Sequence, residues 1–142
     1  MTERTTKGRC LCGAVEIVAA VAESVGACHC DICRRWGGGP LLALDGGSSV
    51  RFDGEPHIAV YPTTEWAQRG FCSRCGTHLF IRVNQTGRYI LPAGLFDLDD
   101  GLQFDHQIFI DKRPAYYRFA NETKDLTGAE VFADFAARQK PG

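Results

Sequence analysis

The sequence lacks a strong charge of either sign and has no long uninterrupted hydrophobic segment. Its 142 residues carry 16 Lys and Arg against 17 Asp and Glu, a formal net charge of −1, so no global field favours nucleic acid or an anionic membrane. The longest apolar runs, such as residues 14–21, are interrupted by Glu16 and are too short to cross a bilayer. We therefore expect neither a nucleic-acid partner nor a membrane partner.

A hydrophobic leader segment is also absent from the start of the sequence. Residues 1–7 read MTERTTK, which has no apolar stretch of the kind found in secretory signals. We therefore expect a cytoplasmic, reducing environment, where clustered cysteines are more often metal ligands or catalytic thiols than disulfides. The cysteine count, seven, is odd, which argues against a full disulfide framework.

What the sequence does have is 16 glycines and many short apolar segments at close spacing. We expect strands at residues 14–18, 24–28, 50–52, 57–61, 66–71, 79–83, 89–91 and 106–110, with a further short apolar run at 41–44. The loop at 84–87 predicts a hairpin, and residues 34–36 form at most one helical turn before 37–40 stop it. Apolar residues at helical spacing predict one helix at 128–138. The sequence thus indicates a single, mainly β domain over 1–142 with a short C-terminal helix.

The seven cysteines fall into three groups whose sizes fit two metal sites. A structural zinc takes four protein ligands, whereas a catalytic zinc takes three and keeps one position open. We hypothesise that one site is closed by the outer cysteines, which are Cys10, Cys12, Cys72 and Cys75. The second, open site is formed by the central cysteines, which are Cys28, Cys30 and Cys33. The chain would then hold two zinc ions.

The spacing within each group indicates how its members face one ion. In an extended segment, residues two apart point to the same face, so Cys10 and Cys12 are expected to face one way. The same holds for Cys28 and Cys30, and His29 between them is expected to point away as a non-ligand. Gly76 follows Cys72-x-x-Cys75 at a position where a positive φ is often needed. A site joining the start of the chain to its middle would contribute folding free energy directly.

Other interpretations of the cysteines remain open at this point. The outer cysteines could be free buried thiols or form a labile disulfide. The central cysteines could recruit His57, His78 or His106 as a fourth ligand and form a second structural site. Alternatively, Cys30-x-x-Cys33 could be a dithiol redox pair, although the third cysteine and the lack of a βαβ pattern argue against this.

An open site of three thiolates favours particular chemistry. Such a zinc complex has a formal charge of −1 and should be a weak Lewis acid, so water activation is not its obvious task. Coordination to zinc still deprotonates a thiol, which favours making or breaking carbon–sulfur bonds over peptide hydrolysis. Arg34 and Arg35, next to Cys33, are candidates for contact with the carboxylates of an acidic thiol substrate.

The three motifs resemble the glutathione-dependent formaldehyde-activating enzyme (GFA/CENP-V) family. The resemblance rests on Cys10-x-Cys12-Gly13, Cys28-His29-Cys30-x-x-Cys33-Arg34 and Phe71-Cys72-x-x-Cys75-Gly76-x-x-Leu79, with a similar downstream strand at 106–114. It covers about residues 5–120 and implies an Mss4-like, β-rich fold. It also implies a structural zinc on the outer cysteines and a catalytic zinc on the central cysteines.

The family resemblance implies an activity and two hypotheses about function. The activity is the reversible addition of glutathione to formaldehyde, which gives S-(hydroxymethyl)glutathione, so the first hypothesis is a zinc-dependent carbon–sulfur lyase acting on a small thiol adduct. The alternative is a non-catalytic, zinc-stabilised binding module, because the Mss4-like fold also serves as a protein-interaction platform. The chain departs from the family at Ala115-Tyr116-Tyr117, where members usually carry a tryptophan, and in its tail at 121–142. The sequence does not indicate the oligomeric state.

Overall fold

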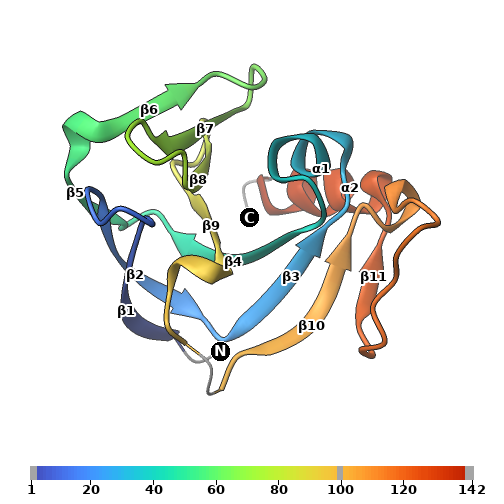
Figure 1. Ribbon diagram of the computed structural model, residues 1–142. Helices are drawn as coiled ribbons and strands as arrows, with labels where there is room; N and C mark the ends of the chain where they lie inside the picture. Colours follow the sequence, from blue (N-terminus) through green and yellow to red (C-terminus); the bar gives the residue numbers. More distant parts are fainter. Residues whose placement is uncertain (1–2, 99–100, 140–142) are drawn as a thin grey trace. The chain divides into compact units, whose positions relative to one another are not determined.

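The computed structural model describes residues 3–98 and 101–139 and divides into two compact units (Figure 1). The first unit comprises residues 1–24 and 43–102, and the second comprises residues 25–42 and 103–142. Each unit is therefore assembled from two stretches that are distant in the sequence. Each unit also contains one complete group of cysteines, the outer group in the first and the central group in the second.

The first unit begins with a three-stranded antiparallel sheet in the order β1-β2-β5. Its strands are β1 (Glu3–Arg9), β2 (Glu16–Ala22) and β5 (Arg51–Asp53). Strand β2 alternates buried Ile17, Ala19 and Val21 with less buried neighbours, the pattern of a sheet with one face in the core. Strand β1 pairs along its whole length with β2 and ends directly before Cys10.

The remaining strands of the first unit run antiparallel in the order β4-β9-β8-β7-β6. They are β4 (Leu41–Gly47), β6 (Ile58–Tyr61), β7 (Ala67–Cys72), β8 (His78–Val83) and β9 (Tyr89–Pro92), with short 3₁₀ helices η1 (Glu55–His57) and η2 (Ala93–Leu95). The predicted hairpin is confirmed, because Ile81 pairs with Ile90 across it. Fully buried Leu44, Leu79 and Leu91 form the centre of this packing.

The second unit is built on three strands in the order β11-β10-β3, which lie side by side in Figure 1. They are β3 (Ser24–Cys28), β10 (Gln103–Ile108) and β11 (Lys124–Leu126), and β11 runs parallel to β10. Helix α1 (Asp31–Gly37) follows β3, η3 (Ile110–Lys112) follows β10, and α2 (Gly128–Gln139) follows β11. The rings of Phe109 and Phe132 meet edge to face at 5.8 Å and connect η3 with α2.

The expected mainly β fold with a short C-terminal helix is confirmed. Within residues 3–98 and 101–139, no helix combines the length and the apolar character needed to cross a bilayer. Strands β1 and β11 were not predicted, since neither carries a clear apolar alternation. Strand β11 takes its place by pairing with β10, a contact between residues 18 positions apart such as His106 and Lys124.

Two predicted boundaries are wrong. The strand expected at 106–110 ends at Ile108, because Phe109 adopts a left-handed conformation with φ 54° and ψ 42° and starts η3. The helical turn expected at 34–36 is a longer helix that begins at Asp31. Its first turn forms earlier because the Cys33 N–H donates to Cys30 Sγ at 3.3 Å, which caps the helix.

Candidate functional site

The outer cysteines lie in two turns of the chain, which together form the outer site. The first turn follows β1 and carries Cys10 and Cys12. Cys10 N–H donates to the carbonyl of Val15 at 3.0 Å, and Gly13 N–H donates back to the carbonyl of Cys10 at 3.1 Å. The expectation that Cys10 and Cys12 share one face of an extended segment is therefore wrong. A tight turn brings their Sγ atoms to 3.6 Å instead.

The second turn of the outer site follows β7. Gly76 N–H donates to the carbonyl of Cys72 at 2.8 Å, and Cys72 N–H donates to the carbonyl of Thr77 at 2.9 Å. Gly76 has a φ of 82°, which confirms the expected positive value, and Gly13 has the same φ after the first turn. A hydrogen bond from Leu11 N–H to Thr77 Oγ1 at 3.0 Å ties the two turns together.

The four outer sulfur atoms lie at separations that suit a tetrahedral metal ion. All four are within 4.8 Å of one another, and Cys12 Sγ lies 3.8 Å from Cys72 Sγ. A tetrahedral zinc with bonds of about 2.3 Å would separate its sulfur ligands by about 3.8 Å. All seven cysteines are free, so the outer cysteines do not form a disulfide in this structure. The donor set and its spacing fit a zinc ion.

Thr77 completes the outer site, and sequence reasoning did not identify it. Its Oγ1 lies 3.1 Å from Cys75 Sγ, and its side chain and backbone N–H lower the pKa of the Cys75 thiol to about 5. Thr77 therefore favours the thiolate that metal binding requires. The only hint in the sequence was its position directly after Gly76.

The central cysteines come together at the junction of β3 and α1. Cys28 is the last residue of β3, Cys30 caps α1, and Cys33 lies buried in the first turn of that helix. Their three Sγ atoms lie within 4.8 Å of one another, and among the described residues of the second unit no histidine nitrogen joins the group. His106 of the same unit has its Nδ1 2.7 Å from Asp105 Oδ1. The described residues thus supply three sulfur donors.

The protonation states of the three central thiols depend on one another, and a bound cation would change them. The Cys28 and Cys33 side chains, followed by the backbone N–H groups of Cys33 and Ile32, lower the pKa of Cys30 to about 2. Contacts with Cys30 and Cys33 raise the pKa of Cys28. One thiolate therefore forms readily, whereas three together require a positive ion to stabilise them. This donor set fits a soft, thiophilic metal with one position left for another ligand.

His29 lies between two central cysteines, and its ring is fully buried. Its Nδ1 lies 2.7 Å from the Tyr117 hydroxyl, and its Nε2 lies 2.7 Å from Gln107 Oε1. Gln107 donates through its Nε2 to Thr123 Oγ1 at 2.9 Å, so its Oε1 is the acceptor. His29 Nε2 therefore carries the proton, and Nδ1 accepts from Tyr117. Both ring nitrogens are engaged, in agreement with the expectation that His29 is not a ligand.

The surroundings of His29 keep its imidazole ring neutral and hold its hydrogen-bond partner Tyr117 in place. Burial lowers the pKa of His29, so the imidazole is uncharged at neutral pH. Burial also raises the pKa of Tyr117, and Arg113 Nη1 donates to the Tyr117 carbonyl at 2.6 Å. Tyr117 belongs to residues 115–117, where we expected a departure from the family. Its pairing with His29 spans 88 residues, so no local signal in the sequence could have revealed it.

The two arginines expected near the substrate have different surroundings. Arg34 Nε donates to the carbonyl of His29 at 3.0 Å, and its Nη2 forms an ion pair with Asp31 at 2.9 Å. Arg34 therefore supports the loop that carries the central cysteines. Arg35 is exposed on α1 and remains a predicted substrate contact.

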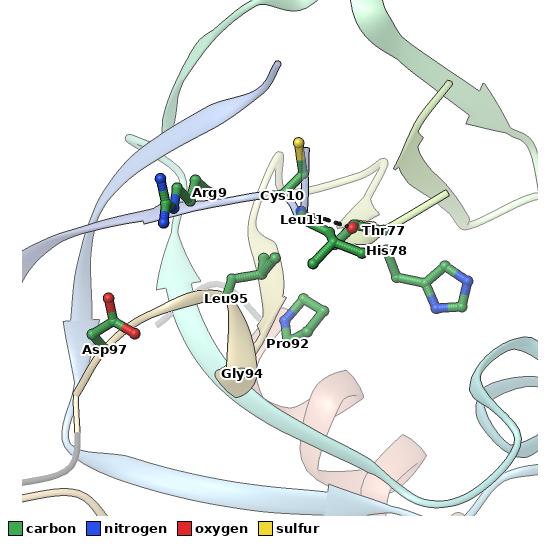
Figure 2. Close-up of a pocket in the computed structure, with 9 residues that line it drawn as sticks. All are labelled: Arg9, Cys10, Leu11, Thr77, His78, Pro92, Gly94, Leu95 and Asp97. Atoms are coloured by element: carbon green, nitrogen blue, oxygen red, sulfur yellow. Dashed lines mark hydrogen bonds between the residues drawn. The ribbon is translucent and has the colours of Figure 1, made fainter. Parts of the chain in front are cut away.

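Each unit also contains a cavity. The first unit has one of about 460 Å³ beside the outer cysteines, and Figure 2 shows its lining, which includes Arg9, Leu11, Pro92, Leu95 and Asp97. Figure 2 shows the Cys10 sulfur directed away from Pro92 and Leu95, so this cavity does not offer that thiolate to a ligand. The second unit has a cavity of about 370 Å³ that is lined in part by Gln107 and Arg113.

Comparisons with known proteins identify a family and similar chains. The family described as glutathione-dependent formaldehyde-activating enzyme matches residues 5–112. A Schizosaccharomyces pombe protein described as an uncharacterized lyase is 35% identical over 127 residues, covering 88% of this chain and 93% of its own length. A Halomonas elongata protein that carries the family's name is 33% identical over 85 residues, covering 53% of this chain and 54% of its own length. A crystal structure of a Rhodobacter sphaeroides protein superimposes with a TM-score of 0.55 at 27% identity, covering 66% of this chain and 88% of that one.

Proposed function

Because the chain belongs to the glutathione-dependent formaldehyde-activating enzyme family, we propose that it is a zinc-dependent carbon–sulfur lyase. Its substrate is a small thiol adduct such as S-(hydroxymethyl)glutathione. In one direction the thiol sulfur bonds to the carbonyl carbon of formaldehyde and the thiol proton ends on the oxygen. In the other direction the same carbon–sulfur bond breaks and both reactants return. The observation that carries the proposal is the set of three converging sulfur donors at Cys28, Cys30 and Cys33.

The two groups of cysteines have separate roles in this proposal. The outer cysteines hold a structural zinc that joins two turns of the first unit. The central cysteines hold the catalytic zinc, which would supply an open position where a thiol binds and loses its proton. Seven free thiols are best preserved in a reducing compartment, so we place the enzyme in the cytoplasm.

Tyr117 and His29 orient the substrate in this proposal. The Tyr117 hydroxyl donates its proton to the neutral His29 Nδ1, so its oxygen lone pairs are directed elsewhere. Those lone pairs can accept a hydrogen bond from the hydroxymethyl group or from an incoming thiol. Gln107 fixes the ring of His29 from its other side, which preserves this direction of donation. The Tyr117 hydroxyl thus provides a hydrogen-bond acceptor next to His29, which lies between Cys28 and Cys30.

Native mass spectrometry with and without glutathione tests the proposal. We expect two zinc ions per chain and a thiol adduct that disappears when Cys30 is changed to Ser. The Cys30→Ser variant should keep the outer zinc and the fold but lose the acceleration of formaldehyde exchange with glutathione, measured by exchange NMR. A fully active Cys30→Ser variant would falsify the proposal. Two zinc ions with no adduct for any thiol would favour the non-catalytic binding module instead.

A further inference from the structure

Strand β11 brings two polar side chains to a buried amide of the second unit. The strand is three residues long and pairs in parallel with β10, in a register that places Asp125 opposite Gln107. Thr123 comes directly before the strand, and its hydroxyl lies 2.6 Å from Asp125 Oδ1. The amide Nε2 of Gln107 donates to the same hydroxyl at 2.9 Å. The register of β11 thus determines which groups Gln107 meets.

These contacts continue inward as a hydrogen-bond network of five side chains. The Oε1 of Gln107 lies 2.7 Å from His29 Nε2, and His29 Nδ1 lies 2.7 Å from the Tyr117 hydroxyl. Four hydrogen bonds therefore join an exposed carboxylate to a tyrosine through a fully buried imidazole ring. The members of the network are Tyr117, His29, Gln107, Thr123 and Asp125.

Most members of the network can donate in either direction. A hydroxyl group both donates and accepts, and a neutral imidazole carries its proton on either nitrogen. An amide can be turned over, which exchanges its donor and acceptor with little change of shape. The first four members alone are therefore compatible with two opposite arrangements of protons. In one arrangement the Tyr117 proton points to His29, and in the other it points away.

Asp125 distinguishes the two arrangements, because an ionised carboxylate accepts hydrogen bonds and donates none. It takes the single hydroxyl proton of Thr123, whose oxygen then accepts from Gln107 Nε2. The Oε1 of Gln107 is left to accept from His29 Nε2. The other ring nitrogen, Nδ1, then accepts from Tyr117. The opposite arrangement would place two oxygen atoms without a proton 2.6 Å apart at Asp125.

The bond at the exposed end is strong enough to orient the rest. Its length of 2.6 Å is typical of a hydroxyl that donates to a charged carboxylate, a bond about twice as strong as a neutral one. Gln107 is 5% exposed and the ring of His29 is fully buried, so both find their partners within the protein. A direction that is set at Asp125 therefore extends inward to Tyr117.

The inner end of the network lies within the electrostatic field of a central cysteine. Burial is the main cause that raises the pKa of Tyr117, and a negative charge on Cys28 contributes in the same direction. Arg113 Nη1 donates to the Tyr117 carbonyl at 2.6 Å and holds the residue in place. The direction of the Tyr117 hydroxyl therefore matters for the reaction proposed at the central cysteines.

We propose that Asp125 is a positioning residue, which acts through Thr123 and Gln107 to fix the tautomer of His29 and the direction of the Tyr117 lone pairs. Both Thr123 and Asp125 lie beyond residue 112, where the family match ends. The effect on turnover rests on the proposed function, because only there does Tyr117 accept a hydrogen bond from the substrate. The effect on the His29 tautomer does not depend on that function.

The tautomer of His29 is the direct readout, because long-range ¹H–¹⁵N NMR distinguishes a protonated ring nitrogen from an unprotonated one. We would record it on the full-length chain labelled with ¹⁵N-histidine. The signals of His29 are those that persist when His57, His78 and His106 are each replaced by Gln. In the parent chain we expect the proton on Nε2 and none on Nδ1.

Asp125→Asn keeps the shape of the side chain but can donate to Thr123 as well as accept. Both arrangements then become possible, so we expect a second set of His29 signals with the proton on Nδ1. Thr123→Val, which removes the hydroxyl, should also show the second set, whereas Thr123→Ser, which keeps it, should not. In Asp125→Asn the exchange of formaldehyde with glutathione should slow about threefold to tenfold, the effect of one hydrogen bond.

Glu122→Gln is the matched control for the loss of charge. Glu122 is an exposed carboxylate of the same segment and takes part in none of the four hydrogen bonds of the network. Its replacement changes the net charge by the same amount as Asp125→Asn, so the His29 tautomer and turnover should stay as in the parent. A purely structural role of Asp125 would lower the Tm without moving the His29 proton.

The outcomes separate this proposal from the proposed function. A single Nε2-protonated form in both Asp125→Asn and Thr123→Val, or the same change in Glu122→Gln, would overturn the positioning role even if the parent accelerates the exchange. A second tautomer with unchanged turnover would overturn the role in the reaction. A shift of tautomer in a protein whose parent accelerates no thiol reaction would refute the lyase and leave the control of His29 by Asp125 standing.

Discussion

Gly76 shows how a single backbone conformation supports the outer site. Its φ of 82° lies in the left-handed region, which costs a residue with a side chain about 1–2 kcal/mol. We expect Gly76→Ala to lower the free energy of unfolding of the zinc-loaded chain by about that amount, measured by denaturant titration. Gly94→Ala is the matched control, because a side-chain carbon at Gly94 meets nothing within 4 Å and its φ is not positive. Equal effects of the two changes would contradict this role of Gly76.

Apart from the cysteines, Tyr117 is the residue that we expect to affect turnover most, through its hydroxyl group. Tyr117→Phe removes the donor to the buried Nδ1 of His29, an unsatisfied polar atom that costs about 1–3 kcal/mol. We expect kcat/KM for the thiol adduct to fall about tenfold while the zinc content stays at two per chain.

Tyr116→Phe provides the control for that prediction. Tyr116 is 76% exposed and sits beside Tyr117, so loss of its hydroxyl should change neither stability nor turnover. Assays well below the unfolding temperature separate turnover from stability. Indistinguishable turnover of the two variants would remove the orienting role of Tyr117.

At the level of single residues, the sequence predicted which cysteines come together in two groups that could hold metal ions, but not the residues that support them. The cysteines could be grouped because ligand counts and short spacings are local features. Gln107 and Tyr117 could not be assigned, since each acts through a partner brought close by folding, and the bond from Leu11 to Thr77 likewise joins residues 66 positions apart. Gln107 and His29, for example, are 78 positions apart. The turn geometry at Cys10 was also missed, because two cysteines two positions apart fit a strand and a turn equally well.

Among the elements, α2 begins with a cap whose contribution to stability we expect to depend on pH. Thr127 N–H donates to Glu130 Oε1 at 2.8 Å, and Glu130 N–H donates to Thr127 Oγ1 at 3.2 Å, which is a reciprocal capping box. The Thr127 backbone and side-chain hydrogen bonds lower the pKa of Glu130 below 4.5. Because the folded pKa is below the unfolded one, this contribution is present above pH 4.5 and is lost as pH falls through the lowered value.

Two variants of the cap test this account. Thr127→Ala should destabilise α2 by about 1 kcal/mol, seen as faster amide exchange in residues 128–132. Glu130→Gln keeps an acceptor but cannot titrate, so its unfolding free energy should lose the acid-dependent component of the parent between pH 5 and pH 3. The same acid dependence in Glu130→Gln and the parent chain would show that another group is responsible.

The elements that could be predicted were those with their own periodicity. Strand β3 and helix α2 begin at the predicted residues, because apolar alternation and helical spacing are present in their own sequences. Strands β1 and β11 gain their conformation from the partners beside them, and the break at Phe109 follows from its packing against Gly128 and Phe132. Such tertiary effects override local propensity.

Over the whole molecule, the two proposed zinc sites connect very different lengths of chain. The outer site joins Cys12 to Cys72, which are 60 positions apart, whereas the central site lies within 28–33. Closing a longer loop removes more entropy from the unfolded chain. We therefore expect Cys75→Ser to lower the Tm more than Cys30→Ser does, measured by calorimetry on chains with zinc content checked by mass spectrometry. The opposite order would show that the outer site does not hold the first unit together.

The assembly of the second unit from two distant stretches has a consequence for synthesis on the ribosome. His29, which lies between two of the central cysteines, emerges 88 residues before Tyr117, an interval of roughly 4–18 s at ordinary elongation rates. During that interval the nascent thiols lack the strand and the tyrosine that later bury their surroundings. We expect ribosome-bound chains that are stalled before residue 103 to be alkylated readily at Cys28. Chains that have been released from the ribosome and extend beyond residue 125 should resist alkylation at Cys28. Equal labelling of both would show that the early segment protects itself.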